Sequence, residues 1–170
     1  MDPSPAVDFS KPVHAAGAWS VAFRAWYRAV RLLERPLIWL ATTRGFGNVV
    51  MLRVGGRRSG VERSIPLGLL SVSGKWYLGH PSGDTAWTLN LRAAQAAVIT
   101  SAGVPATRVR ATVLRPGAER DAVVRETFRQ HPFPGNALYR LAGRHVSATG
   151  VFLRLEPARP RNVVRSRSAG

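Results

Sequence analysis

Apolar residues recur at helical spacing near the start of the chain, between residues 19 and 35. The apolar face of the helix that this spacing predicts comprises Trp19, Ala22, Phe23, Trp26, Tyr27, Val30 and Leu33. The opposite face is basic and comprises Arg24, Arg28, Arg31 and Arg35. We therefore expect an amphipathic helix, which Pro36 interrupts before another turn or two of helix over residues 37–41.

The middle of the chain changes to short apolar runs separated by glycine-containing turns, a pattern typical of β-strands. We expect strands at residues 49–54, 63–72 and 75–79, arranged as a three-stranded meander with a tight turn at Ser73-Gly74. A helix capped by Asp84 or Thr85 follows, through Trp87, Leu91 and Ala94. Residues 97–101 and 106–115 then predict a hairpin around Ala102-Gly103.

The second half adds helices to these antiparallel strands. The spacing predicts a helix over residues 118–130, a short helix around residues 138–141 and a final strand over residues 150–155. Short turns between antiparallel strands indicate an α+β, mainly β architecture, a small barrel decorated by helices.

The length of 170 residues fits one domain. We expect an irregular lead-in over residues 1–17, the barrel domain with its N-terminal helix over residues 18–156, and a basic disordered tail over residues 157–170.

The charge of the chain indicates anionic partners. Lys and Arg number 25 against 9 acidic residues, a net charge of +16, and all the basic residues are arginine except Lys11 and Lys75. The planar fork of arginine suits bidentate contact with phosphate or carboxylate, which favours specific anion sites over a diffuse coating. A GC-rich coding genome would produce the same bias, so that explanation stays open.

Cysteine is absent, which excludes disulfides and thiolate metal sites and fits a reducing compartment. The first residues lack the pattern of a signal peptide, and no apolar run reaches membrane-spanning length. We expect a cytoplasmic protein, with peripheral contact at the inner face of the membrane as an option. His14, His80, His131 and His145 lie far apart, so no metal site is expected.

The turn at residues 55–60 combines groups that suit a bound anion. Its sequence is Gly-Gly-Arg-Arg-Ser-Gly, with glycines that let backbone amides approach a ligand, two guanidinium groups and a hydroxyl. It is not a P-loop, because the Lys-Ser/Thr pair is absent and no helix clearly follows. Taken alone, a solvated hairpin turn that happens to carry arginines explains it equally well.

The residues around this turn add a second pattern. Arg63 and Pro66-Leu67 follow it, and Trp87 with Asn90-Leu91 stands further along. In this order the motifs resemble the deazaflavin-dependent nitroreductase family, within the split β-barrel flavin and deazaflavin oxidoreductases. The resemblance covers residues 49–157 in order of elements, with motif identity in these two stretches. It implies an FMN-binding-like split β-barrel with an N-terminal amphipathic helix and inserted helices.

The resemblance also implies a cofactor, the deazaflavin coenzyme F420, ahead of FMN. The turn would hold the phosphate and carboxylates of the coenzyme tail, the following strand would run beside its rings, and the later helix would close the site. The residues implied are Gly56, Arg57, Arg58, Ser59, Gly60, Arg63, Ile65, Pro66, Leu67, Gly68, Trp87 and Asn90. Hydride transfer to a small-molecule acceptor, such as an enone or nitro compound, also needs a proton, for which Tyr139 and His80 are candidates.

The chain departs from the family pattern mainly at the substrate end. Many members have threonines where this chain has Arg53-Val54-Gly55, and a proline where it has Thr85-Ala86. Several members carry a tyrosine-rich segment after the late helix, whereas residues 130–140 keep Tyr139 as their single phenol. The identity of the acceptor, and whether turnover occurs, therefore stay open.

Two other functions remain as alternatives. A relative of the same fold that binds fatty acyl chains without catalysis would explain a basic, aromatic N-terminal helix, which would lie on an anionic membrane. Nucleic-acid binding is permitted by the charge, but no recognised motif supports it, so no specific nucleic acid is expected. The family likeness favours a homodimer.

Overall fold

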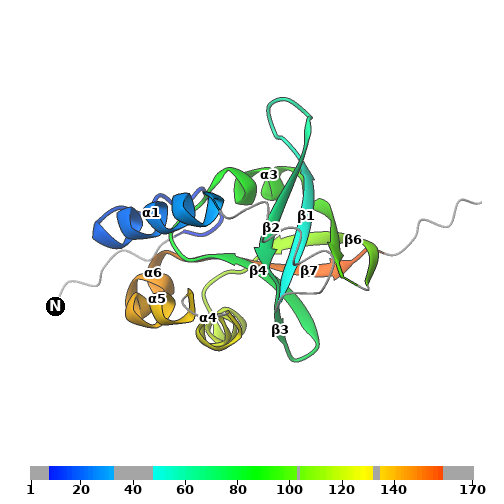
Figure 1. Ribbon diagram of the computed structural model, residues 1–170. Helices are drawn as coiled ribbons and strands as arrows, with labels where there is room; N and C mark the ends of the chain where they lie inside the picture. Colours follow the sequence, from blue (N-terminus) through cyan, green and yellow to red (C-terminus); the bar gives the residue numbers. More distant parts are fainter. Residues whose placement is uncertain (1–7, 33–47, 103, 132–134, 159–170) are drawn as a thin grey trace, which may run out of the picture.

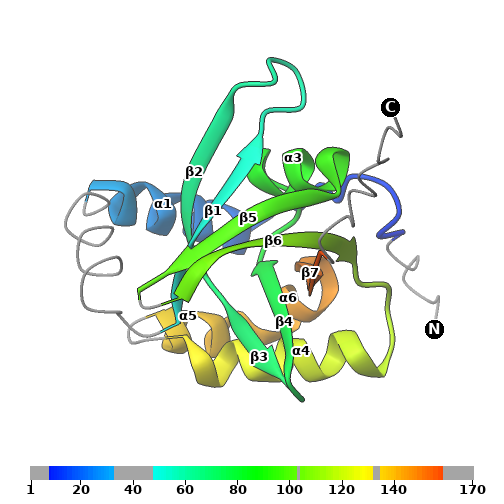
Figure 2. The same cartoon turned by 90° about the vertical axis from the view of Figure 1, so that its right-hand side faces the viewer.

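Seven antiparallel strands form one curled sheet in the computed structural model, which describes residues 8–32, 48–102, 104–131 and 135–158 (Figures 1 and 2). The order across the sheet is β2-β1-β5-β6-β7-β4-β3. The strands are β1 (Val49–Gly55), β2 (Glu62–Gly68), β3 (Leu70–Val72), β4 (Lys75–His80), β5 (Ala96–Ser101), β6 (Val104–Val113) and β7 (Val151–Pro157).

Helices cover the sheet on two sides (Figure 1). They are α1 (Ala18–Leu32), α3 (Ala86–Ala94), α4 (Ala118–Gln130), α5 (Gly135–Leu141) and α6 (Gly143–Thr149). α3 packs against β1, β5 and β6, whereas α4 packs against β3 and contacts both α5 and α6. None of the helices described here has both the length and the apolar character needed to cross a membrane.

The core divides into two clusters, because the central strands bury residues on both faces. In β7, Leu153 and Leu155 belong to a cluster inside the curl of the sheet, while Phe152 belongs to a second cluster between the sheet and the helices. Adjacent strand residues face opposite sides, so alternation assigns each residue to its cluster. The second cluster includes Tyr139, which places this candidate residue at the junction of sheet and helices.

α1 packs its apolar face on the rest of the chain. Phe23 is 1% exposed, and its ring stacks on Tyr139 of α5 and on His145 of α6. Arg24 and Arg28 lie on the exposed side, as the amphipathic pattern predicts. Because Phe23 is covered by the protein itself, this part of the apolar face is not available to a membrane.

Most of the predicted strands and helices are present, but the predicted meander is wrong. Residues 63–72 form two strands that lie at opposite edges of the sheet. The break comes at Leu69, whose N–H donates to the Asn48 carbonyl (2.7 Å) and whose carbonyl accepts from Asn48 Nδ2 (2.9 Å). Asn48 thereby satisfies both backbone groups of Leu69 where the chain leaves one edge for the other.

Two further differences concern helices and the ends of the chain. Helix α6 was not predicted between the short helix and the final strand. The predicted turns over residues 37–41 and almost all of the predicted tail lie outside the described residues.

The segment before α1 packs into the core although it forms no helix or strand in residues 8–17. Phe9 and Val13 are 4% and 5% exposed. The Val13 N–H donates to Asp84 Oδ2 (2.8 Å), and Arg92 donates to the Phe9 carbonyl (3.1 Å). The guanidinium of Arg120 lies 4.4 Å from the centre of the Phe9 ring. The division of the chain at residues 17 and 156 stays a prediction.

We predict that Arg92→Ala destabilises the fold by about 3 kcal/mol, measured by urea denaturation, because it leaves a buried carboxylate without its cation. Arg92 Nη2 lies 3.0 Å from Asp84 Oδ2, and these side chains are 12% and 1% exposed. The N–H groups of Arg92 Nη2 do not point at Asp84 Oδ2, so the two side chains attract each other by charge without a hydrogen bond. Arg129→Ala, in a pair whose arginine is 75% exposed, is the control and should cost less than about 1 kcal/mol. Equal losses in the two variants would contradict the prediction.

Candidate functional site

The turn at residues 55–60 joins β1 to β2 and projects from one end of the sheet (Figure 1). The Gly56 N–H donates to the Val61 carbonyl (2.9 Å), and the Gly60 N–H donates to the Gly56 carbonyl (2.8 Å). Gly60 has φ +68°, a conformation that favours glycine. A Cβ at Gly56 would lie 2.9 Å from Ser59 Oγ. These two amides therefore hold the turn together and do not reach outward, unlike the expected amide cradle.

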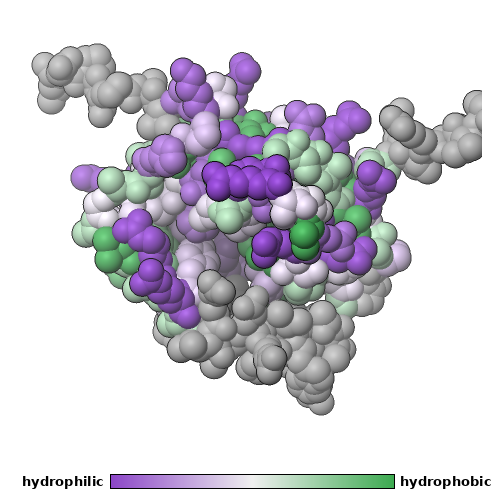
Figure 3. Space-filling view, turned by 90° about the horizontal axis from the view of Figure 1, so that it is seen from above, coloured by the Kyte–Doolittle hydropathy of each residue, from purple (hydrophilic) through white to green (hydrophobic). Residues whose placement is uncertain are grey.

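The arginine side chains are what the turn presents to solvent. Arg57, Arg58, Ser59 and Arg63 are all exposed. Figure 3 looks down on this end of the molecule, where hydrophilic residues gather. The turn can thus hold an anion through guanidinium groups and a hydroxyl, with charge-assisted hydrogen bonds.

Asn90 of α3 fixes the position of the turn. Its Oδ1 accepts from the backbone N–H of Arg57 (3.2 Å) and from Arg57 Nη1 (3.1 Å). Asn90 is 6% exposed, and its helix is anchored by Trp87 and Leu91, which are 8% and 0% exposed. The two stretches quoted for the family resemblance, 33 residues apart, therefore meet in space.

β2 leads from the turn to the other end of the candidate site. Ile65 and Leu67 are partly buried and pack against the cluster inside the curl, and Pro66 pairs with Met51 of β1. Seven residues at about 3.4 Å each separate the ends of β2 by roughly 20 Å. The site residues expected along the chain from Gly56 to Gly68 therefore lie along one extended track.

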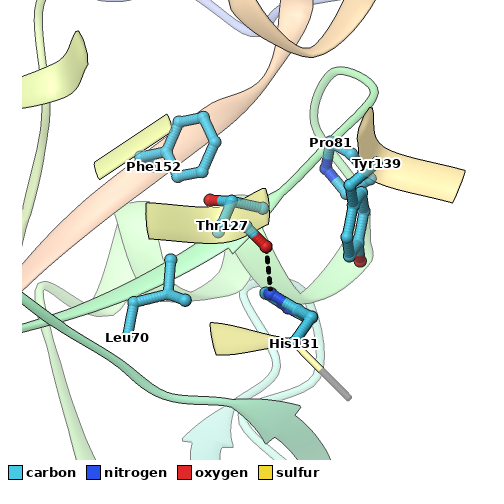
Figure 4. A pocket seen from close by; sticks show the side chains of 7 residues that line it. Leu70, Pro81, Thr127, His131, Tyr139 and Phe152 are labelled. Carbon is cyan, nitrogen blue, oxygen red and sulfur yellow. Dashed lines mark hydrogen bonds between the residues drawn. The ribbon is translucent and has the colours of Figure 1, made fainter. Parts of the chain in front are cut away.

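Gly68, at the far end of β2, is approached by a side chain of the protein. A Cβ at this position would lie 3.0 Å from His131 Nε2. His131 Nδ1 lies 3.0 Å from the Thr127 carbonyl, so the tautomer with the proton on Nδ1 donates there and leaves Nε2 as an acceptor (Figure 4). Burial lowers the pKa of His131.

Tyr139 and His80 are brought into one cluster by a third residue, Tyr27. The hydroxyls of Tyr27 and Tyr139 lie 2.7 Å apart. The Tyr27 ring stacks on the His80 ring with centroids 5.1 Å apart, and the His131 ring meets the Tyr139 ring edge-on at 4.6 Å. A small hollow beside this cluster is lined by Leu70, Gly79, Pro81, Thr127, His131, Tyr139 and Phe152 (Figure 4).

The hollow contains about 180 Å³ of space that no atom fills, some of it continuous with solvent. None of this space admits the centre of a water-sized sphere. The walls are therefore closed on one another in this conformation, with Tyr139 and Pro81 on one side (Figure 4).

The two candidate proton donors differ in protonation. Burial lowers the pKa of His80 to about 4, although contacts with Gly83 and Ser82 oppose the shift, so the ring is neutral at pH 7. Its Nδ1 lies 3.1 Å from the Gly83 carbonyl. Burial raises the pKa of Tyr139 to about 12, so the phenol keeps its proton. Near neutral pH His80 is therefore not an imidazolium acid, and Tyr139 is a neutral phenol that can donate a hydrogen bond.

Tyr27 and His131 are the members of this cluster that the sequence did not single out. Tyr27 was assigned to the apolar face of the first helix, and His131 to the end of a later one. A tyrosine on an apolar helix face is a usable signal, because its buried hydroxyl needs a partner. Among the residues with described placement, no group of His, Asp or Glu side chains could hold a metal ion.

No protein-family model and no curated protein matches the chain. The solved structures that are similar to it include two that align over almost their whole length. One, described as a domain-swapped dimer, aligns with 78% of this chain and 98% of its own, with TM-score 0.50 and 21% identity. The other, the F420-H2 dependent reductase FDR-A, aligns with 64% of this chain and 94% of its own, with TM-score 0.51 and 19% identity.

At these identities the similarity establishes the fold. The chain has an α+β architecture with a curled antiparallel half-barrel, and the expected split-barrel class is confirmed. The resemblance to the F420-dependent reductases, first indicated by two motifs, is confirmed at the level of fold.

We predict that His80→Gln reduces the pH dependence of stability. Below pH 6.5 the unfolded chain binds a proton at His80, whereas the folded chain does not until pH falls to about 4. His80 therefore lowers the free energy of unfolding as the pH decreases across this window, by about 2 kcal/mol between pH 7 and pH 5. Chemical denaturation at both pH values measures the change. His14→Gln, at an exposed histidine, is the control, and an unchanged pH dependence in His80→Gln would contradict the assignment.

We predict that Asn90→Leu loosens the turn, because it keeps the branched shape and the number of side-chain heavy atoms but removes the oxygen that accepts from Arg57. The Arg57 amide should exchange with solvent roughly tenfold faster, measured by native-state hydrogen exchange. Asn90→Asp retains an acceptor oxygen and should preserve the protection. Equal exchange in wild type and Asn90→Leu would show that another contact holds the turn.

Proposed function

We propose that the protein is an F420H2-dependent oxidoreductase, which transfers a hydride between the deazaflavin coenzyme and an organic acceptor such as an enone or nitro compound. The observation that carries this proposal is the contact of Asn90 with Arg57, which joins the two motifs of the family resemblance. The fold shared with an F420-H2 dependent reductase supports it.

The exposed turn fits the anionic end of this coenzyme. A phosphodiester and a glutamate tail carry several negative charges, and Arg57, Arg58 and Arg63 offer three exposed guanidinium groups next to Ser59. Arg57 is already oriented by Asn90, so less side-chain freedom is lost when an anion binds. Gly56 and Gly60 keep the turn tight beneath these side chains.

The buried end fits the reacting end of the coenzyme. When bound, the reduced deazaflavin supplies the hydride, and the protein supplies binding, orientation and exclusion of water. Ile65 to Gly68 would line its rings, Trp87 would keep α3 in place, and apolar Leu70 and Phe152 would keep water away. Tyr139 Oη holds the proton that a reduced acceptor needs. His80 would support the cluster as a neutral ring beneath Tyr27.

Other features of the proposal follow from the same residues. FMN is the alternative cofactor, since its phosphate would also suit the arginines. A homodimer is proposed because the protein similar in fold over most of this chain is itself described as a domain-swapped dimer. The acyl-binding alternative has less support, because Phe23 of α1 is covered by the protein.

We predict that the purified protein binds F420 with micromolar or tighter affinity, measured by fluorescence titration. The double variant Arg57→Ala with Arg58→Ala should bind about thirtyfold more weakly, since two exposed charge-assisted contacts contribute about 2 kcal/mol. Arg108→Ala with Arg110→Ala, on the exposed side of β6, removes the same charge elsewhere and is the control. Absence of saturable binding would overturn the proposal, and equal losses in both double variants would indicate nonspecific charge attraction.

A further inference from the structure

Residues 8–13, which we call the strap, lie against the segment that leads into α3. The Val13 N–H donates to Asp84 Oδ2 (2.8 Å), and the Val13 carbonyl accepts from the Asp84 N–H (2.7 Å). Gly83, with φ +65°, stands next to Asp84, and a Cβ there would lie 2.6 Å from the Val13 carbonyl oxygen. The glycine therefore allows the backbone of the strap to come this close.

The strap also contacts the other end of α3. Arg92, in the last turn of this helix, donates from Nη1 to the carbonyls of Phe9 (3.1 Å) and Lys11 (3.2 Å). The side chains of Phe9 and Val13 belong to the same buried cluster as Trp87 of α3. The strap is thus bonded at both ends of the helix and shares its apolar core.

α3 is also the helix that fixes the turn at residues 55–60. Its Asn90 accepts hydrogen bonds from the N–H and from Nη1 of Arg57 (3.2 and 3.1 Å). Because a helix moves as a unit, the position of Asn90 depends on how α3 is seated. A displacement of roughly 0.5 Å would take these two contacts beyond hydrogen-bond range. The contacts of the strap with α3 therefore bear on the orientation of Arg57.

The strap can open without unfolding of the sheet. It forms no helix or strand, and its docking covers charged groups. The side chain of Asp84 is 1% exposed, and the guanidinium of Arg120 lies 4.4 Å from the centre of the Phe9 ring. Hydration of these charges in the open state offsets part of the gain from burying Phe9 and Val13. Opening of the strap consequently costs less free energy than unfolding of the sheet.

We propose that docking of the strap on α3 regulates the arginine turn, with Asn90 as the link. The docked strap keeps Arg57 in the orientation that suits an anion, and the open strap releases Arg57 and weakens anion binding. The coupling is reciprocal, so an anion that holds Arg57 in place also favours the docked strap. The identification of this anion as the tail of F420 rests on the proposed function, whereas the link between strap and turn does not.

Two variants displace the strap by different means, and native-state hydrogen exchange of the coenzyme-free protein measures the result. Val13→Ala removes apolar contacts, and Gly83→Ala places a methyl group against the Val13 carbonyl. In both variants the Arg57 amide should exchange about tenfold faster, because opening of the strap releases α3. The Gly60 amide, which donates to the Gly56 carbonyl within the turn, should exchange as in the wild type.

Each variant has a matched control. Val123→Ala makes the same change at a buried valine of the second core cluster. Gly74→Ala adds the same methyl group at a glycine with φ +74° and open space around it. Neither control should accelerate exchange of the Arg57 amide. Equal exchange of this amide in strap variants and controls, or equal acceleration of the Gly60 amide, would overturn the proposal. Val13→Ala decides the outcome if Gly83→Ala does not fold.

Addition of F420 tests the reciprocal effect. At saturating F420 the Val13 amide of the wild type should exchange several-fold more slowly, and Val13→Ala should bind F420 several-fold more weakly than Val123→Ala does. Unchanged exchange of the Val13 amide at saturation would contradict the coupling. Failure of the wild type to bind F420 would count against the proposed function, and the coenzyme-free exchange would still decide whether strap and turn are linked.

Discussion

The break in the sheet at Leu69 is the constraint on which the site depends. Asn48 satisfies both backbone groups of Leu69, so the chain can leave one edge of the sheet after β2 and enter the other edge as β3 without a buried unpaired amide. This passage curls the sheet and carries the end of β2 toward the helices. Gly68 consequently lies against His131, and the strand that follows the arginine turn ends beside the Tyr139 cluster.

The two ends of β2 have opposite physical character. At one end the turn is exposed and cationic, and it is positioned by a single buried amide oxygen from Asn90. At the other end the side chains are buried, the histidines are shifted toward their neutral forms, and the tyrosines retain their protons. An extended ligand with an anionic tail and a neutral reacting end matches this polarity.

The first helix and the segment before it connect fold to site. Phe9 and Val13 fill the core while Arg92, Arg120 and Asp84 hold their backbone or rings. The following helix can then place Phe23 and Tyr27 against Tyr139 and His80. The N-terminal region therefore has a structural role in the core and a direct place beside the candidate reacting groups.

The sequence by itself determined the class of elements, because period-2 and period-3.6 patterns are local properties. It placed the hairpin of β5 and β6 and the helix α4, and its two motifs indicated the split-barrel fold. It assigned residues 63–72 to one strand, because the alternation continues through Leu69 and only the contact with Asn48 interrupts it. Only the tertiary structure showed that Asn90 binds Arg57 and that Tyr27 binds Tyr139, 112 residues away. Such contacts depend on how distant segments pack, and no local periodicity encodes them.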